Sequence, residues 1–204
     1  NTHSGFELER NYYPLPQIIN KYVTFGSFNN FNKINDDVIK VWSKILNKVE
    51  GSKLILKSST KKETTRMKKI FGKYTSIDSI SFLKTKKSFK EHLYLYKNID
   101  IALDTFPYNG VTTSFEAIWM GVPVLVMKGF NFNSRCGESI NRNLGMENLI
   151  AEDEKDYIFI AKKLAEDKEK LSNLRKKIFK TSYDTPLFDK KKFSKDFFKT
   201  LENI

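Results

Sequence analysis

The chain has 204 residues, which fits one ordinary domain or two small ones. Apolar residues make up 40% of it and aromatic residues 14%, enough for a hydrophobic core, so wholesale disorder is excluded. The formal net charge is +12, but only five of the 36 basic residues are arginine, the side chain best suited to reading bases. We therefore interpret the charge as a solvated lysine-rich surface and predict no nucleic-acid partner.

Cysteine content and hydropathy exclude several further classes. The single cysteine, Cys136, excludes an intramolecular disulfide and a cysteine-built zinc site, and it fits a reducing compartment, so we expect a cytoplasmic protein. The longest apolar stretches, such as residues 122–127, have the length of a strand, so no membrane span is predicted. The chain begins at Asn1 without a Met or a visible signal peptide, and we interpret it as part of a longer protein.

Short β-branched runs alternate along the chain with longer segments of helical periodicity. Asn35 is expected to cap the first long helix, and Gly51 to end it. We predict strands at 22–27, 53–57, 79–83, 99–104, 122–127 and 149–151, and helices at 35–50, 62–74, 89–96, 112–120, 134–143, 153–166, 168–182 and 189–202. This alternation predicts an α/β fold, a doubly wound Rossmann-like parallel sheet with a helical C-terminal tail. Residues 1–20 are expected to be a linker from a preceding region, and residues 21–204 the domain itself.

In an open parallel sheet, ligands bind at the carboxyl ends of the strands, near the point where the strand order reverses. Two predicted loops at such ends have unusual content. The first, residues 26–33, reads Gly-Ser-Phe-Asn-Asn-Phe-Asn-Lys and gathers amide and ammonium donors, including Asn30 and Lys33. The alternative is a polar loop in which asparagine tolerates unusual backbone angles.

The second loop, residues 104–116, reads Asp-Thr-Phe-Pro-Tyr-Asn-Gly-Val-Thr-Thr-Ser-Phe-Glu. Asn109 and Gly110 form a tight turn, after which Thr112 and Thr113 open a helix whose free amides and hydroxyls suit an anion. Glu116, one turn further, suits the hydroxyls of a ribose. The simpler alternative makes Thr112 the N-cap and Glu116 a first-turn acid. Together the two loops favour a nucleotide-phosphate site.

Other chemistries find little support in the sequence. His92 lies on a short predicted helix, where a lone histidine is more often a surface or core residue than a functional one. With no second histidine nearby and no Asp-x-Asp, we expect no metal and no cofactor. The absence of Gly-x-Gly-x-x-Gly and of a P-loop motif disfavours redox dinucleotides and P-loop chemistry.

Three long stretches carry a family resemblance: Val-Thr-Phe-Gly-Ser-Phe-Asn-Asn-Phe-Asn-Lys-Ile (23–34), residues 100–113 and residues 116–123. They closely resemble the O-linked N-acetylglucosamine transferase and SPINDLY-like family, and shorter matches continue the likeness from residue 134 to residue 188. The resemblance implies a two-lobed GT-B glycosyltransferase, of which this chain is the carboxyl-terminal lobe. In that family the lobe binds a UDP-sugar donor without a metal.

The resemblance also implies residue roles. Asn30 stands where a glutamine contacts the donor nucleotide, and Lys33 matches the lysine that neutralises the diphosphate as UDP leaves, the catalytic role expected here. His92 matches a histidine near the uracil and ribose. The remaining donor-binding residues are the phosphate-binding pair and the ribose acid, with the turn before them: Asn109, Gly110, Thr112, Thr113 and Glu116.

The chain also departs from the family pattern. Phe89 and Leu95 occupy positions where the animal enzyme has basic residues near the nucleotide, and Val111 replaces a histidine, so uracil preference and sugar identity do not follow. The amino-terminal lobe with its catalytic histidine, and the tetratricopeptide repeats that grip the acceptor, are not in this sequence. His3 matches neither.

The resemblance implies an inverting transfer in which an acceptor hydroxyl displaces UDP at the sugar's anomeric carbon. We expect N-acetylglucosamine to be moved to Ser or Thr hydroxyls of an acceptor protein or peptide, which binds through the absent lobe and repeats. The 204-residue chain alone is expected to be inactive. Three alternatives stay open: transfer to Asn side chains or a glycan, a nucleotide-sugar-binding module without activity, and a basic nucleic-acid binder, against which the arginine-poor composition argues.

Overall fold

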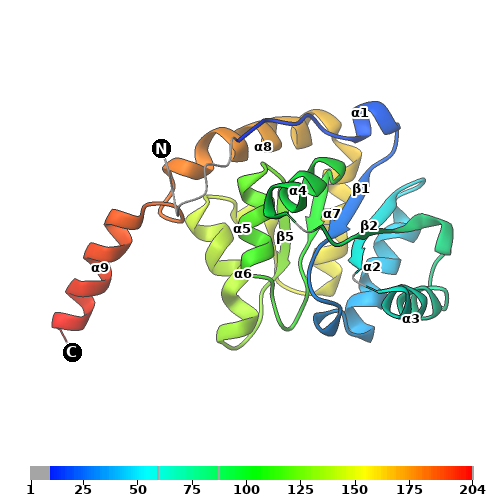
Figure 1. The fold of residues 1–204 in the computed structure, drawn as a ribbon, viewed down its shortest axis with the longest axis horizontal. Helices are drawn as coiled ribbons and strands as arrows, with labels where there is room; N and C mark the ends of the chain where they lie inside the picture. The colour runs from blue at the N-terminus through cyan, green and yellow to red at the C-terminus, as the bar shows by residue number, and fades with distance from the viewer. Residues whose placement is uncertain (1–9, 59, 87, 204) are drawn as a thin grey trace.

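A parallel six-stranded sheet forms the centre of the computed structural model, which describes residues 10–58, 60–86 and 88–203 (Figure 1). Its strands run in the order β3-β2-β1-β4-β5-β6. Their bounds are β1 Thr24–Ser27, β2 Lys53–Ser58, β3 Ile80–Lys84, β4 Ile101–Leu103, β5 Val124–Met127 and β6 Ile150–Ala151. The strand order reverses between β1 and β4, as in doubly wound sheets, which confirms the predicted fold class.

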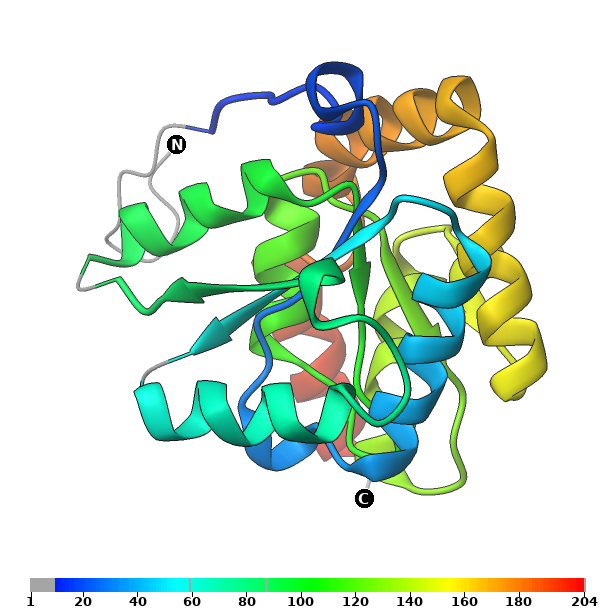
Figure 2. The same cartoon turned by 90° about the vertical axis from the view of Figure 1, so that its right-hand side faces the viewer.

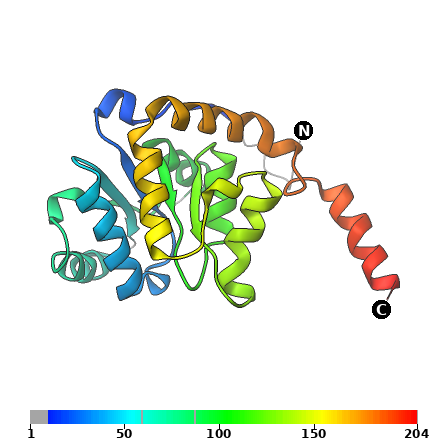
Figure 3. The ribbon, with the colours of Figure 1, turned by 180° about the vertical axis from the view of Figure 1, so that it is seen from behind.

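Helices cover both faces of this sheet. α2 packs beside α7 on one face (Figure 3), α4 and α5 lie on the other (Figure 1), and Figure 2 shows the strands between the two layers. The helix bounds are α1 Gln17–Asn20, α2 Asp36–Lys48, α3 Lys61–Phe71, α4 Phe89–Tyr94, α5 Thr112–Trp119, α6 Phe132–Asn143, α7 Glu154–Glu166, α8 Lys168–Thr181 and α9 Lys190–Glu202. None of the helices in the described part of the chain is long and apolar enough to cross a membrane.

Local sequence explains where helices begin and end. The Asn35 side chain accepts a hydrogen bond from the Val38 amide at 2.9 Å and so caps α2, as predicted. The helix predicted at 89–96 is split, because α4 ends at Tyr94 and a 3-10 helix, η3 (Leu95–Asn98), follows. The helix predicted from residue 134 begins at Phe132, since Asn131 and Ser134 form a reciprocal capping box.

The segment before β1 packs against the domain in its described part. Leu15 is fully buried, and the Gln17 amide donates to Asp100 Oδ1 at 3.1 Å. Arg10 donates to Ser182 Oγ and to the Trp119 carbonyl, each at 2.7 Å. Residues 1–9 of the predicted linker lie outside the described residues.

The C-terminal helices differ in how they contact the domain. α8 packs against α5 and α7, and its Arg175, which is fully buried, donates to the Ile99 carbonyl at 2.7 Å. α9 projects away from the domain (Figures 1 and 3) and buries no residue. Among the described residues, those of the buried core run from Leu15 to Ile178 of α8, and none of them lies in α9.

Candidate functional site

The two loops predicted to bind a ligand meet at the carboxyl edge of β1 and β4. Phe25 of β1 pairs with Ile101 of β4, so the segments that follow these strands leave the sheet side by side. Asn29 Nδ2 then donates to Asp104 Oδ1 at 3.2 Å, joining residues 75 positions apart. Gly26 permits this close pairing, because a Cβ there would lie 2.3 Å from the Ile99 side chain.

Asp104 ties the second loop to the end of β4. Its carboxyl group is buried, and Oδ1 accepts hydrogen bonds from the amides of Gly110 at 2.7 Å and Thr105 at 2.9 Å, besides the one from Asn29. Burial raises the pKa of Asp104 to about 7, although these hydrogen bonds and the nearby Lys33 charge act in the opposite direction. The turn from residue 105 to residue 110 is thus closed on one carboxylate oxygen.

Lys33 is held against the same turn. Its ammonium donates to the Asn109 carbonyl at 2.9 Å and lies 4.3 Å from the centre of the Tyr108 ring. Burial lowers the pKa of Lys33, and the Asp104 charge partly offsets this. Lys33 therefore places a partly desolvated cation at the carboxyl edge of the sheet.

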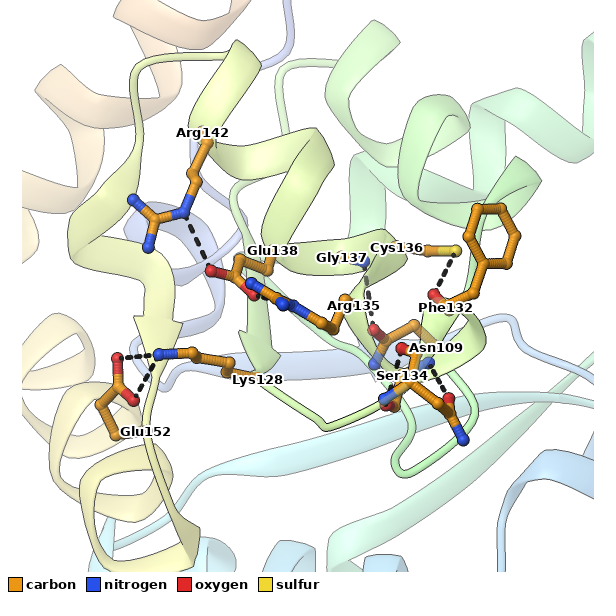
Figure 4. Close-up of polar contacts among 11 residues, drawn as sticks. Asn109, Lys128, Phe132, Ser134, Arg135, Cys136, Gly137, Glu138, Arg142 and Glu152 are labelled. Carbon is orange, nitrogen blue, oxygen red and sulfur yellow. Dashed lines mark hydrogen bonds and ion pairs between the residues drawn. The ribbon is translucent and has the colours of Figure 1, made fainter.

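Asn109 supports the turn from inside. Its Nδ2 donates to the Thr105 carbonyl at 2.8 Å, and its Oδ1 accepts from the Gly137 amide at 3.1 Å. Figure 4 shows Asn109 beside the first turns of α6, where its own amide donates to the Asn133 carbonyl at 3.2 Å. The side chain of Asn109 is 1% exposed, so in this structure it braces the turn from within.

Ion pairs within α6 stabilise the helix that contacts this turn (Figure 4). Arg135 and Arg142 donate to the two oxygens of the buried Glu138 at 2.9 and 3.0 Å. The hydrogen bond from Arg135 lowers the pKa of Glu138, so the carboxylate stays charged. Sequence reasoning did not find this support, although the i, i+3 and i, i+4 spacing of these three residues is the signal for it.

The start of α5 differs from the simpler alternative given above. Its N-cap is Val111, with no capping side chain, so Thr112 is the first helical residue, as predicted, and the simpler alternative with Thr112 as N-cap is wrong. Among the described residues, the backbone amides of Thr112 and Thr113 have no hydrogen-bond partner, while Thr113 Oγ1 donates to Asn29 Oδ1 at 3.0 Å. Two open amides at the positive end of a helix suit an anion.

His92 and Glu116 form a second cluster beside this helix start. His92 Nε2 and the Tyr96 hydroxyl both lie 2.9 Å from Glu116 Oε2, and the Tyr96 hydroxyl is 3.1 Å from the Thr113 carbonyl. The rings of Phe28 and His92 are 6.0 Å apart between centres. Sequence reasoning missed Tyr96, although its position four residues after His92 places both on one helical face.

The remaining predicted residues lie around this edge. Asn30 is exposed, and its Oδ1 accepts from the Asn32 amide at 2.9 Å, which begins the 3-10 helix η1 (Phe31–Lys33) that carries Lys33. Of the three departures from the family pattern, Leu95 is buried, whereas Phe89 and Val111 are exposed.

The space beneath the two loops is small. A cavity of about 10 Å³ lies between Asn29, Asp104 and Thr113, enough for about one water molecule. A nucleotide does not fit inside it, so the candidate site is the open edge above the loops. Across the described residues, no group of three or more His, Cys, Asp or Glu side chains is arranged to hold a metal ion.

Sequence comparisons identify the relatives of this chain. The model of glycosyl transferase family 41 matches residues 6–197. SPINDLY proteins of Eustoma exaltatum subsp. russellianum and Solanum lycopersicum, each described as a probable UDP-N-acetylglucosamine–peptide N-acetylglucosaminyltransferase, are 36% identical over 190 residues, which are 90% of this chain and 20% of theirs. The UDP-N-acetylglucosamine–peptide N-acetylglucosaminyltransferase of Caenorhabditis elegans is 29% identical over 88% of this chain and 16% of its own. The chain thus spans a fifth or less of the length of these curated relatives.

Solved structures show the same fold. A mutant of the Thermobaculum terrenum O-GlcNAc transferase matches with a TM-score of 0.84 and 29% identity, over 89% of this chain and 36% of that one. Anabaena HepE, solved in complex with UDP and glucose, matches with a TM-score of 0.62 over 93% of this chain and 51% of that one, but at 12% identity it shows the fold alone. With the fold of a GT-B lobe and a family match over most of its length, the chain belongs to glycosyl transferase family 41.

Proposed function

We propose that this chain is the donor-binding lobe of an inverting glycosyltransferase that moves N-acetylglucosamine from UDP to Ser or Thr hydroxyls of proteins. The observation that carries the proposal is the Lys33 ammonium bound to the turn that leads into the uncapped start of α5, at the edge where β1 and β4 end. The names of the SPINDLY and nematode relatives support the choice of donor and acceptor.

The residues at the carboxyl edge of β1 and β4 have different roles in this proposal. As the bond between sugar and phosphate breaks, negative charge gathers on the leaving β-phosphate of UDP. Lys33 and the open amides of Thr112 and Thr113 stabilise that charge more strongly than they stabilise the ground state, which accelerates the transfer. Glu116, whose Oε2 is held by His92 and Tyr96, accepts hydrogen bonds from the ribose hydroxyls through its second oxygen.

Calorimetry of the 204-residue chain with UDP in the presence of EDTA tests the donor part of this proposal. We expect saturable binding that adding magnesium does not strengthen. Uridine serves as the matched ligand without phosphates and should bind more weakly, because it leaves Lys33 and the helix start unused. An absence of UDP binding, or binding that requires a divalent metal, would reject the proposed donor site.

A further inference from the structure

The geometry points to Asp104 as a positioning residue of this edge, whose carboxylate fixes the turn 105–110 and the Asn29 side chain, and through them the groups that face the donor diphosphate. This inference rests on the proposed function. Asp104 itself is 1% exposed and does not reach the surface where a donor would lie. Its influence is therefore transmitted through the residues it binds.

One oxygen of Asp104 closes the turn at both ends. Oδ1 accepts from the Thr105 amide at 2.9 Å and from the Gly110 amide at 2.7 Å, so the first and last residues of the turn point inward at the same atom. A Cβ at Gly110 would lie 2.8 Å from that oxygen, 2.5 Å from Thr113 Oγ1 and 2.9 Å from Asn29 Oδ1. Only glycine fits a backbone this close to three polar atoms.

The turn 105–110 also positions Lys33. Its ammonium donates to the carbonyl of Asn109, which lies in the turn, and the Asn109 side chain is bonded to Thr105 and Gly137. If the turn is released from Asp104, the acceptor that holds the ammonium moves with it. Lys33 then loses its defined place at the edge.

Asp104 also determines which end of the Asn29 side-chain amide faces Thr113 of α5. Asp104 Oδ1 accepts from two backbone amides, so Asn29 must direct its Nδ2 at this oxygen and its Oδ1 at Thr113 Oγ1. The Thr113 hydroxyl then donates its proton to Asn29 and offers a ligand only its lone pairs. The phosphate donors at the helix start are consequently the amides of Thr112 and Thr113 and the exposed Thr112 hydroxyl.

The second carboxylate oxygen of Asp104 indicates which substitution removes the charge but keeps the hydrogen bonds to the turn. Among the described residues Asp104 Oδ2 is buried without a hydrogen-bond partner. An asparagine at this position can place its carbonyl oxygen where Oδ1 lies and its amide where Oδ2 lies, which keeps the three accepted hydrogen bonds. Asp104→Asn is therefore the conservative variant, and Asp104→Ala removes the acceptor altogether.

The experiment measures UDP and uridine affinities of the 204-residue chain for the wild type, Asp104→Ala and Asp104→Asn. We expect Asp104→Ala to weaken UDP by about tenfold or more while uridine changes less than about threefold, and Asp104→Asn to retain UDP affinity within about threefold. Amide spectra of the ligand-free proteins should show the Thr105 and Gly110 resonances displaced in Asp104→Ala and near their wild-type positions in Asp104→Asn. Asp100→Asn, at the opposite end of β4, is the matched control and should leave both affinities unchanged.

Equal losses of UDP and uridine in Asp104→Ala would overturn the inference, since they indicate general loss of structure. Unchanged UDP affinity in a folded Asp104→Ala variant, or an Asp104→Asn variant as impaired as Asp104→Ala, would also overturn it. If Asp104→Ala does not fold, Asp104→Ser, whose side chain is too short to reach the turn, provides the same comparison. A wild type that binds no UDP rejects the proposed function instead, and the ligand-free spectra still decide whether Asp104 holds the turn.

Discussion

His92 Nε2 lies 2.9 Å from Glu116 Oε2, and this contact joins α4 to α5 across 24 positions of sequence. Both side chains are about nine-tenths buried, at 12% and 10% exposure. The Tyr96 hydroxyl lies 2.9 Å from the same oxygen. The carboxylate of Glu116 is therefore oriented before any ligand arrives, which favours a role in recognising fixed hydroxyl groups such as those of a ribose.

From this pair we predict that Glu116→Ala weakens UDP and uridine by similar factors, roughly tenfold. His92→Ala should produce a smaller loss, and the double variant should lose no more than Glu116→Ala alone, because His92 acts by orienting Glu116. Titration calorimetry of the two single variants and the double variant measures this coupling. Glu91→Ala, an exposed acid beside His92, is the control. Additive losses would contradict the orienting role.

Lys33→Ala is expected to separate the two ligands. Because Lys33 is predicted to act on the diphosphate, UDP affinity should fall by about 1.5–3 kcal/mol, while uridine affinity stays nearly constant. Titrating Lys33→Ala with both ligands measures the difference, and Lys40→Ala, an exposed lysine of α2, is the control. Equal losses of UDP and uridine would mean that the phosphate assignment of Lys33 is wrong.

The stability of the domain should depend on pH through Asp100 and Asp104. Burial raises their pKa values to about 6 and about 7, from 3.8. The folded chain therefore binds these two protons more tightly than the unfolded chain, so their contribution to the free energy of unfolding is complete below about pH 4 and is lost as the pH rises through about 6 and about 7.

The measurable consequence is a pH-dependent difference between Asp104→Asn and the wild type. From pH 5 to pH 8 the free energy of unfolding of the variant, relative to that of the wild type, should rise by roughly 1–3 kcal/mol, because asparagine carries no titrating proton. Urea unfolding at the two pH values measures it. Tyr96 and Tyr157, which lie near Asp104, stay neutral in this range because their pKa values are raised well above 10. A difference that does not change with pH would contradict the burial effect on Asp104.

Asn109→Ala should act mainly by lowering the stability of the fold. The substitution leaves the Thr105 carbonyl and the Gly137 amide without their partners in a buried place, which should lower the free energy of unfolding by about 2–4 kcal/mol. Denaturant unfolding provides the measurement. Asn143→Ala, which removes only an exposed bond to the Ser139 carbonyl, should change stability by less than about 1 kcal/mol. A loss of the same size in both variants would contradict the internal bracing role of Asn109.

The fold was predictable because each strand is a short apolar run, and a glycine, a proline or a polar turn separates it from the next element. All six predicted strands are present, and their bounds differ from the prediction by at most two residues. The split after Tyr94 was not predictable in the same way, since the periodicity of residues 89–96 is the same for an α-helix and for the α-helix with a 3-10 turn that is found.

Some residues of the candidate site could also be predicted from the sequence, and others could not. Lys33, Thr112 and Glu116 could be found because each follows a local signal, a polar loop or a helix start after a strand. Asn29 and Asp104 were not assigned roles, since their contact exists only because β1 lies next to β4. That neighbour relation belongs to the strand order of the whole sheet, and no window of sequence contains it.

The reversal of strand order has a consequence for folding. Strands β1, β2 and β3 come from one continuous stretch of chain, and β4, β5 and β6 from the next, so the sheet consists of two sequential halves joined at a single seam. Lys33 and Asn29 belong to the first half, and Asp104, Thr113 and Glu116 to the second. A nucleotide bound at the seam would act as a non-covalent cross-link between the halves, and at a concentration of 100 times its dissociation constant it would add about 2.7 kcal/mol to the free energy of unfolding.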